Sequence, residues 1–375
     1  MKIAILTSRY PSKEQPYNHM FVHTRARNIQ KSCPVTVFVP SNQSENYVYE
    51  GINVVKTSNK KIIDLVADAD LLYLHLLNIY PFSKESGLLI YKHIIKKNLP
   101  HAIYIHGSEV QKYGQYGFDF DFSIRQITKF FFKDFFVIPH MRLFFKTTYK
   151  RRNNLVLFPS KWMKNTAEKS LNIKFDNYKI IPNGIDTDFF DLKHELSINP
   201  RRMVSIRSFS SEVYDIKKTI ELMSLLPDDY TLDIYGEGKL ILKYKKLIVK
   251  MNLEKRVKII PKFLDHENMK KTFRSYDLFI STTRFDSQGV TMLEAVSSGL
   301  LLVTINNSSR EEFIEDGVTG LLANNIYELS NKILEITNNN ALFQKVVLQG
   351  SSKMKDLNTD YISEKEIDAL KNVIL

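Results

Sequence analysis

The segment 285–299 contains the residue types best suited to chemistry. It follows an apolar run at 278–281 that is typical of a buried strand, and its flexible Gly289 precedes a run of helix formers. At the carboxyl end of a parallel strand, such a turn directs free backbone N–H groups and the positive end of a helix at one place, which suits a phosphate group. Asp286 and Glu294 can then reach one pocket and accept hydrogen bonds from sugar or ribose hydroxyls. An acid that merely stabilises the start of a helix is the competing interpretation.

Short apolar runs alternate with longer amphipathic stretches along the whole chain, which is the pattern of a doubly wound α/β protein. In the first half, the predicted strands are residues 3–7, 35–39, 53–56, 71–75, 102–105 and 155–158. In the second half, the predicted strands are 203–206, 231–235, 257–260, 278–281 and 300–305, with helices at 217–226, 267–274 and 292–298. Two successive Rossmann-like sheets explain this order most simply.

The turn Pro182-Asn183-Gly184 is the strongest local breaker between the two halves, because Gly184 can adopt a left-handed conformation. We therefore expect an N-terminal domain over residues 1–184 and a C-terminal domain over residues 185–355. A closing helix over residues 356–375 follows, with Ile362, Ile367, Leu370 and Ile374 on one side.

The chain has 375 residues, of which 43% are hydrophobic, enough for two cores. Its single cysteine, Cys33, excludes a disulfide framework and a cysteine-rich zinc site. The apolar start is too short for a signal peptide, and about 18 uninterrupted apolar residues occur nowhere. We expect a cytoplasmic protein whose contact with the inner face of the membrane is peripheral.

The formal net charge of +12 is concentrated in the first half. Up to Ile185 there are 27 Lys and Arg against 13 Asp and Glu. After Ile185 there are 26 Lys and Arg against 28 Asp and Glu. The stretch 125–152 alone has eight basic residues, one acid (Asp134) and seven phenylalanines. This mixture predicts contact with an anionic membrane surface. A core helix with solvated lysines is the alternative, and nucleic acid ranks last because no helix-turn-helix, finger or RNP-like pattern accompanies the charge.

Asp286 and Glu294 also fit a family signature, which is an acid, seven residues, then Glu-Ala and a later Gly, here Gly299. Further motifs of the same family occur in order: Ile105-His106-Gly107-Ser108-Glu109, Phe158-Pro159-Ser160, Ile181-Pro182-Asn183-Gly184-Ile185-Asp186, Tyr235-Gly236-Glu237-Gly238 and Glu315-Asp316-Gly317-Val318-Thr319-Gly320-Leu321-Leu322. By this set, the chain resembles the retaining nucleotide-sugar glycosyltransferases of the GT-B fold, in glycosyltransferase family 4 (glycosyltransferase group 1). The resemblance implies an α/β protein with two Rossmann-like domains that face each other across a cleft.

The resemblance also implies roles for single residues. Glu294 would bind the nucleotide ribose, and Asp286 the hydroxyls of the transferred sugar. Arg207 would bind the diphosphate, for which a planar, always charged guanidinium is well suited. The backbone at Gly289, Val290 and Thr291 would bind the sugar and the distal phosphate.

Three further residues lie at the end of a predicted strand or just after one, and are weaker candidates. His106 matches a family position that faces the sugar and the acceptor, and His75 is a similar but weaker case. Phe263 would flank the nucleotide base or, equally well, pack in the core.

The chain departs from the family pattern in three places. The loop after the first predicted strand, residues 9–19, lacks the Gly-rich sequence that the family tends to have there. The family has a phosphate-binding Lys five residues after the Arg, whereas this chain has Glu212 there. We predict that Lys217 or Lys218, at the start of the next helix, binds the phosphate instead. The alternative is that both are ordinary solvated lysines on a helix surface. The first acid of the signature is usually Glu, so Asp286 is a shortened variant.

No metal site is predicted. Asp119-Phe120-Asp121 superficially resembles a metal-binding Asp pair, but it follows no clear strand. A P-loop, a His-Glu-x-x-His helix and a Gly-x-Ser-x-Gly elbow do not occur in the sequence. We expect no cofactor, and a UDP- or GDP-sugar as the donor substrate.

These observations together predict a metal-independent, retaining glycosyltransferase that moves a sugar from a nucleotide-diphosphate sugar to a saccharide acceptor. The basic stretch suggests that the acceptor is lipid-linked and belongs to bacterial cell-surface polysaccharide synthesis. The alternatives are a GT-B-fold epimerase or sugar phosphorylase, and a non-catalytic protein that binds a membrane surface or nucleic acid.

Overall fold

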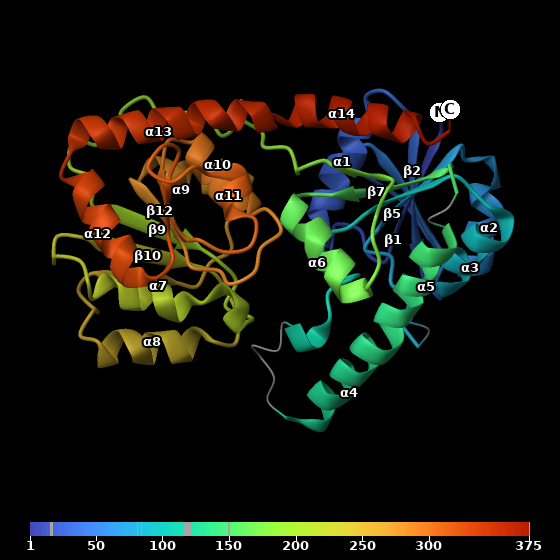
Figure 1. The fold of residues 1–375 in the computed structure, drawn as a ribbon, viewed down its shortest axis with the longest axis horizontal. Coiled ribbons are helices and arrows are strands. Elements are labelled where there is room, and N and C mark those ends of the chain that lie inside the picture. Colours follow the sequence, from blue (N-terminus) through green and yellow to red (C-terminus); the bar gives the residue numbers. More distant parts are fainter. Residues whose placement is uncertain (16–17, 81, 84, 116–121, 149–150, 375) are drawn as a thin grey trace. The chain divides into compact units, whose positions relative to one another are not determined.

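The computed structural model describes residues 1–15, 18–80, 82–83, 85–115, 122–148 and 151–374, and the chain divides into two compact units. Unit 1 consists of Met1–Pro182 and Asp360–Leu375, and unit 2 consists of Asn183–Thr359. Each unit has one sheet flanked by helices (Figure 1). The segment Asp119-Phe120-Asp121 and Lys150 lie outside the described residues.

Unit 1 contains an eight-stranded sheet in the order β3-β4-β2-β1-β5-β6-β7-β8. All neighbours are parallel except β3 and β4. Every residue of the central strands β1 and β5 is buried, so both faces of the sheet are covered and the strands read as continuous apolar runs. The strands are β1 (Ile3–Thr7), β2 (Val35–Pro40), β3 (Glu45–Tyr49), β4 (Ile52–Thr57), β5 (Leu71–His75), β6 (His101–Tyr104), β7 (Asn154–Phe158) and β8 (Tyr178–Ile180).

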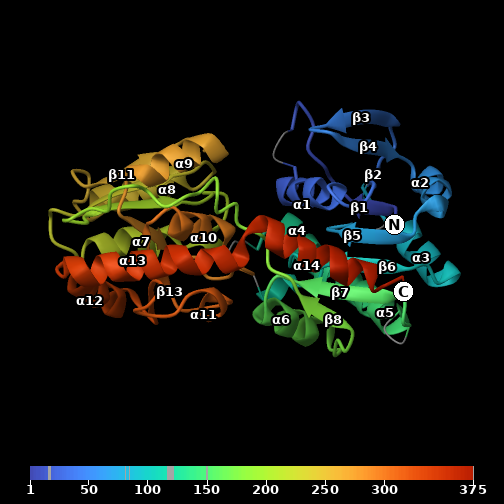
Figure 2. The ribbon, with the colours of Figure 1, turned by 90° about the horizontal axis from the view of Figure 1, so that it is seen from above.

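The helices of unit 1 are α1 (Met20–Gln30), α2 (Asn59–Leu65), α3 (Leu88–Lys97), α4 (Ile124–Phe132), α5 (Ile138–Thr148), α6 (Lys161–Leu171) and α14 (Thr359–Lys371). A π-helical turn, Lys133–Val137, joins α4 to α5. Although α14 comes last in the sequence, it lies beside α1 (Figures 1 and 2). A buried ion pair between Arg25 of α1 and Glu366 of α14 joins the two helices. The Tyr73 hydroxyl donates a further hydrogen bond of 2.6 Å to Glu366.

Unit 2 contains a six-stranded, fully parallel sheet in the order β11-β10-β9-β12-β13-β14. Its strands are β9 (Arg202–Ile206), β10 (Thr231–Tyr235), β11 (Val257–Ile260), β12 (Leu278–Ser281), β13 (Leu301–Ile305) and β14 (Leu321–Ala323). Its helices are α7 (Ile216–Met223), α8 (Ile241–Lys250), α9 (His266–Arg274), α10 (Val290–Ser297), α11 (Arg310–Phe313), α12 (Ile326–Thr337) and α13 (Asn340–Met354).

All eleven strands expected from the sequence are present, with ends that agree within one residue. The sequence pattern missed β3, β8 and β14, because β3 is a largely exposed edge strand and the other two have only three residues. The expectation that Ile374 lies on the buried side of the last helix is wrong. The helix ends at Lys371, and Ile374 is exposed.

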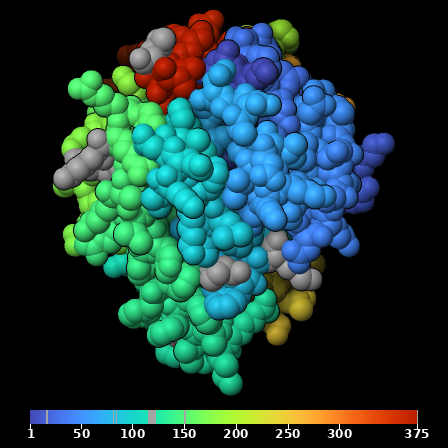
Figure 3. Space-filling view, turned by 90° about the vertical axis from the view of Figure 1, so that its right-hand side faces the viewer, coloured from blue at the N-terminus to red at the C-terminus, as the bar shows by residue number. Residues whose placement is uncertain are grey.

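The phenylalanines of the basic stretch 125–152 divide between the core and the surface. Phe144 and Phe145 pack in the core of unit 1, as the alternative interpretation expected. Phe131 and Phe135 are 57% and 62% exposed, and no residue of the fully described helix α4 is buried. In the space-filling view of Figure 3 this stretch, in green, reaches the lower end of the face. The exposed aromatic rings therefore come from α4 and the π-helical turn, not from α5.

Candidate functional site

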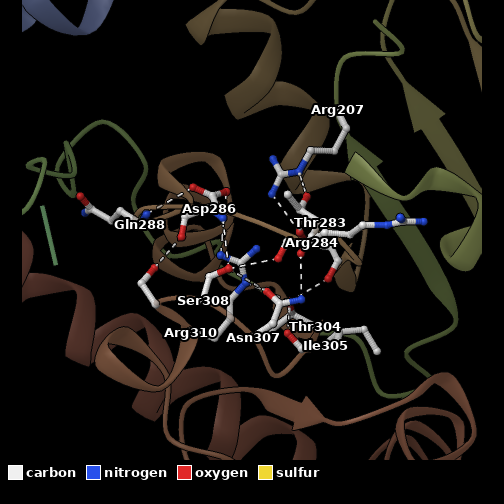
Figure 4. A network of polar contacts seen from close by, with 12 residues as sticks. Arg207, Thr283, Arg284, Asp286, Gln288, Thr304, Ile305, Asn307, Ser308 and Arg310 are labelled. Carbon is white, nitrogen blue, oxygen red and sulfur yellow. Dashed lines mark hydrogen bonds and ion pairs between the residues drawn. The ribbon is translucent and has the colours of Figure 1, made fainter. Parts of the chain in front are cut away.

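The ends of three neighbouring strands in unit 2 carry the polar residues of the candidate site. Because β9 lies between β10 and β12, the strand order reverses there, and the carboxyl ends of strands at such a switch point form the crevice where open α/β sheets bind ligands. Arg207 follows β9, Asp286 lies in the loop after β12, and Arg310 follows β13 (Figure 4).

Arg207 is held at the end of its strand by hydrogen bonds to β12 and the residues that follow it. Its Nε donates to Thr283 Oγ1 at 3.1 Å, and its Nη2 donates to Ser281 Oγ at 3.0 Å. Burial lowers the pKa of the guanidinium, while the nearby Asp286, Tyr214 and Glu294 raise it. These contacts fix the direction of the fork and leave a half-buried cation beside two carboxylates.

Asp286 lies in a loop that several hydrogen bonds hold. Its Oδ1 accepts from the backbone N–H of Gln288 at 3.2 Å, and its own N–H donates to Ser308 Oγ at 3.3 Å. Gln288 is buried, and its side-chain amide both accepts from and donates to Asn183. The other carboxylate oxygen, Oδ2, lies 3.8 Å from Nη1 of Arg310. The carboxylate is therefore oriented by groups on two loops.

Glu294 lies in α10 and is only 7% exposed. Burial raises its pKa to about 7, against the lowering effect of Arg207, and the nearby Asp186 raises it further. Within the described part of the chain, the Glu294 carboxylate has neither a hydrogen-bond nor an ion-pair partner. A buried carboxylate without a partner costs folding free energy, and a perturbed pKa of this kind is typical of functional sites.

The first turn of α10 faces the same strand ends. Gly289, at φ +76°, is the left-handed residue before the helix, and within this described segment the first turn has no side-chain cap and no acid. Val290 and Thr291 thus provide backbone N–H groups at the positive end of a helix, an arrangement that attracts anions.

Arg310 is a residue that the sequence reasoning missed. Its side chain is fully buried, at 0% exposure, and Nε donates to Thr304 Oγ1 at 3.3 Å. Neither Nη1 nor Nη2 has a hydrogen-bond acceptor among the described residues. Burial lowers the pKa of the guanidinium to about 10, while Asp286 raises it. No sequence motif marks this position, and only a basic residue shortly after a buried strand could have drawn attention to it.

Lys217 and Lys218 form ion pairs with acids of their own chain segment. Lys217 pairs with Glu221 at 3.4 Å and Lys218 with Asp215 at 3.6 Å, and about half of each lysine side chain is exposed. Asp215 also accepts from Nε of Arg284 at 2.9 Å, so Lys218 is linked through it to the loop that carries Asp286. The ring of Phe263 is 49% exposed and therefore does not pack in a core.

His106 lies in unit 1, in the loop after β6. Its Nε2 forms a hydrogen bond of 3.0 Å with Nδ1 of His75, the last residue of β5. Burial lowers the pKa of both rings well below the usual value, and Arg25 lowers both further, so both are neutral at physiological pH. Glu109 accepts from the backbone N–H groups of His106 and Gly107 and so holds the loop.

Among the residues that the structure describes, no group of three or more His, Cys, Asp or Glu side chains is placed so that it could hold a metal ion. Likewise, no helix within the described ranges has both the length and the apolar character needed to cross a bilayer. The expected independence of a metal stays a prediction.

The arrangement in unit 2 can bind a negatively charged ligand with hydroxyl groups. The Arg207 guanidinium and the start of α10 attract phosphate oxygens, and the carboxylates of Asp286 and Glu294 accept hydrogen bonds from hydroxyls. A nucleotide-diphosphate sugar has both kinds of group.

Residues 187–351 match the family model described as Glycosyl transferases group 1. A Staphylococcus aureus protein named poly(ribitol-phosphate) alpha-N-acetylglucosaminyltransferase is 30% identical over 145 residues, 37% of this chain. The GtfA subunit of a UDP-N-acetylglucosamine–peptide N-acetylglucosaminyltransferase from Streptococcus agalactiae is 27% identical over 108 residues, 28% of this chain. The matches cover only 28% and 20% of these two relatives.

Solved structures resemble the whole chain. HepE from Anabaena, in complex with UDP, aligns with a TM-score of 0.74 at 15% identity and covers 99% of this chain and 100% of that one. Sucrose-phosphate synthase from Thermosynechococcus elongatus gives a TM-score of 0.73 at 14% identity, with 97% of each chain covered. At such identities the likeness concerns the fold alone.

Proposed function

Residues 187–351 form a domain of the glycosyl transferases group 1 family within a chain of the GT-B fold, and from this premise we propose that the protein is a retaining, metal-independent glycosyltransferase. The predicted fold, an α/β protein with two Rossmann-like domains, is confirmed. The proposed reaction moves a sugar from a nucleotide-diphosphate sugar to a saccharide acceptor. The observation that carries the proposal is the convergence of Arg207, Asp286, Glu294 and the start of α10 at the switch point of the second sheet.

The chemistry of these groups suggests how the donor is held. The buried Glu294 has hydrogen-bonding capacity for the ribose hydroxyls, and Asp286 has it for hydroxyls of the sugar. Arg207 and the N–H groups of Val290 and Thr291 would bind the diphosphate. Since charge develops on the diphosphate as the sugar leaves, groups that are already fixed around it lower the barrier by electrostatic stabilisation. We assign no protein nucleophile and no general base.

A uridine nucleotide is the favoured donor within this proposal. The Streptococcus agalactiae relative is named for UDP-N-acetylglucosamine, and the HepE structure contains UDP. A GDP-sugar is the alternative in the donor test. Phe263, whose ring is 49% exposed, would flank the base.

The proposed acceptor is a lipid-linked saccharide at an anionic membrane surface, in bacterial cell-surface polysaccharide synthesis. Arg125 and Lys129 are exposed on α4, which also carries the exposed ring of Phe131, and Lys146 is exposed further along on α5. This surface suits anionic headgroups, with the rings in the interface.

The same helical segment is attached to the loop of His106. The amino group of Lys133 contacts the carbonyl oxygen of Ser108, and Oδ2 of Asp134 accepts from the N–H of Gly114 at 3.1 Å. A helix that docks on a membrane would thus remain fixed to the loop that we propose faces the acceptor.

Donor specificity is tested by thermal stabilisation with a panel of UDP- and GDP-sugars, followed by product analysis with membrane lipid extract. We expect one nucleotide sugar to stabilise the protein and to yield a glycosylated lipid whose anomeric configuration matches the donor. Glu294→Gln should lose transfer, whereas Glu335→Gln, at an exposed position of α12, should retain it. Conversion of the donor without an acceptor would instead identify an epimerase, and transfer at the wild-type rate by Glu294→Gln would overturn the site.

Membrane contact is tested by cosedimentation with vesicles of anionic or neutral phospholipid. At about 1 kcal/mol per cation near an anionic surface, replacing the three exposed basic residues of α4 and α5 by Gln should weaken binding on the order of 100-fold. The matched control replaces Lys245, Lys246 and Lys250, which are exposed on α8 in unit 2. Equal losses in both triple variants would show that only net charge matters and would refute a docking surface on α4.

A further inference from the structure

Arg310 has contacts that folding alone does not explain. Its guanidinium is completely buried, yet among the residues that the structure describes it makes one hydrogen bond, from Nε to Thr304 Oγ1 at 3.3 Å. Both terminal nitrogens lack an acceptor. A buried charge with unmet hydrogen bonds is costly, and an apolar side chain of similar size would fill the same space at lower cost.

The two terminal nitrogens of Arg310 that lack an acceptor among the described residues lie within the candidate site. Nη1 of Arg310 is 3.8 Å from Oδ2 of Asp286 (Figure 4). It also lies under the start of α10, because a Cβ atom added to Gly289 would be 3.2 Å from it. The guanidinium therefore occupies the space behind the Asp286 carboxylate and the first turn of α10.

The neighbouring arginines act on different partners. Arg207 makes hydrogen bonds to Ser281 and Thr283, and its terminal nitrogens make no ion pair with Asp286. Arg284, two residues before Asp286, donates from Nε to Asp215 at 2.9 Å and points away from the cluster in Figure 4. Among the described residues, Arg310 is thus the one basic side chain that forms an ion pair with Asp286.

We propose that Arg310 is a positioning residue that holds the Asp286 carboxylate in place for the sugar of the donor. This inference rests on the proposed function. Because Arg310 is shielded from solvent, it does not touch the ligand itself. It restricts the carboxylate from behind, while Gln288 restricts it through Oδ1. Recognition of the sugar then depends on Arg310, whereas recognition of the nucleotide, through Glu294 and Arg207, does not.

The test compares the affinity for UDP with that for the UDP-sugar that stabilises the wild-type protein best, by calorimetry. We expect Arg310→Gln to weaken binding of the UDP-sugar on the order of tenfold, because a carboxylate that is no longer held in place loses about one charged hydrogen bond to the sugar, and to leave UDP affinity unchanged. Asp286→Asn should do the same, and the double variant should be no worse than either single variant, because both act through one contact. Arg310→Lys, which keeps the charge, should recover part of the loss.

Arg284→Gln is the matched control, since it removes a guanidinium from the same loop without touching Asp286. It should leave the ratio of the two affinities unchanged. The proposal would be overturned if the affinity losses of the two single variants multiplied in the double variant. It would also be overturned if Arg310→Gln weakened the affinities for UDP and for the UDP-sugar equally. If Arg310→Gln does not fold, Arg310→Lys and Arg310→Met provide the same comparison. Failure of the wild-type protein to bind any nucleotide sugar would instead refute the proposed function, so the two failures are distinguishable.

Discussion

Replacing Glu294 by Gln should stabilise unit 2 at alkaline pH, although it removes a side chain of the proposed donor site. The carboxylate is 7% exposed, and burial raises its pKa to about 7. In the unfolded chain, the same group ionises near the ordinary value of 4.5. Ionisation therefore favours the unfolded state, and the neutral amide of Gln removes this cost.

The sign and size follow from the two pKa values of Glu294. Below pH 4.5 the group is protonated in both states, and it has no effect on the pH dependence. As the pH rises to about 7, only the unfolded state loses its proton, so the folded wild type becomes progressively less stable. The full gap corresponds to roughly 3 kcal/mol, and the part that falls between pH 5.5 and pH 8.5 is roughly 2 kcal/mol.

The assay is urea unfolding followed by pulsed hydrogen exchange of peptides from β12 and α10, at pH 5.5 and pH 8.5. The stability advantage of Glu294→Gln over wild type should grow by roughly 2 kcal/mol between these pH values. Fluorescence of the single tryptophan, Trp162, follows unit 1, which should not respond. Glu335→Gln, at an exposed position, serves as the control in unit 2. An advantage that is equal at both pH values would refute the reasoning that burial keeps Glu294 protonated.

Three further outcomes are expected. UDP affinity of the wild type should fall as the pH drops below about 7, because ribose hydroxyls donate to the ionised Glu294, and titration calorimetry of Glu294→Gln should show a smaller fall, since there only the terminal phosphate of UDP, with a pKa of about 6, still titrates. Glu366→Gln should cost unit 1 about 3–5 kcal/mol in urea unfolding, because the buried Arg25 loses its carboxylate, whereas the exposed Asp368→Asn should cost less than about 0.5 kcal/mol. Gly236→Ala should destabilise unit 2 by more than about 1 kcal/mol in the same assay, because its Cβ would lie 1.9 Å from a backbone oxygen at the end of β9.

The strands were predictable because each is a short apolar run whose burial is a local property of the sequence. β1, β5, β10, β11 and β12 begin and end where the pattern places them. The antiparallel edge strand β3 was missed because its exposed, polar residues give no apolar signal. Helix ends were less well placed, since a period of 3.6 residues marks a face more sharply than a terminus.

The basic stretch shows where a local pattern is ambiguous. Its seven phenylalanines look alike in the sequence, but Phe144 and Phe145 of α5 are core residues and Phe131 and Phe135 are exposed. Which ring is buried depends on whether a sheet lies against that part of the helix, and this is decided by distant segments of the chain.

The sequence by itself determined the two sheets, the strand-end loops that carry Arg207 and Asp286, and the helix that carries Glu294, because apolar periodicity and turn residues act locally. Only the tertiary structure decided the electrostatics of those residues. The burial that raises the pKa of Glu294, and the fully buried Arg310 behind Asp286, arise where β9, β12 and β13 meet, although about a hundred residues separate the first from the last. A charge is stabilised or destabilised by what surrounds it in space, and residues far apart in the chain supply those surroundings.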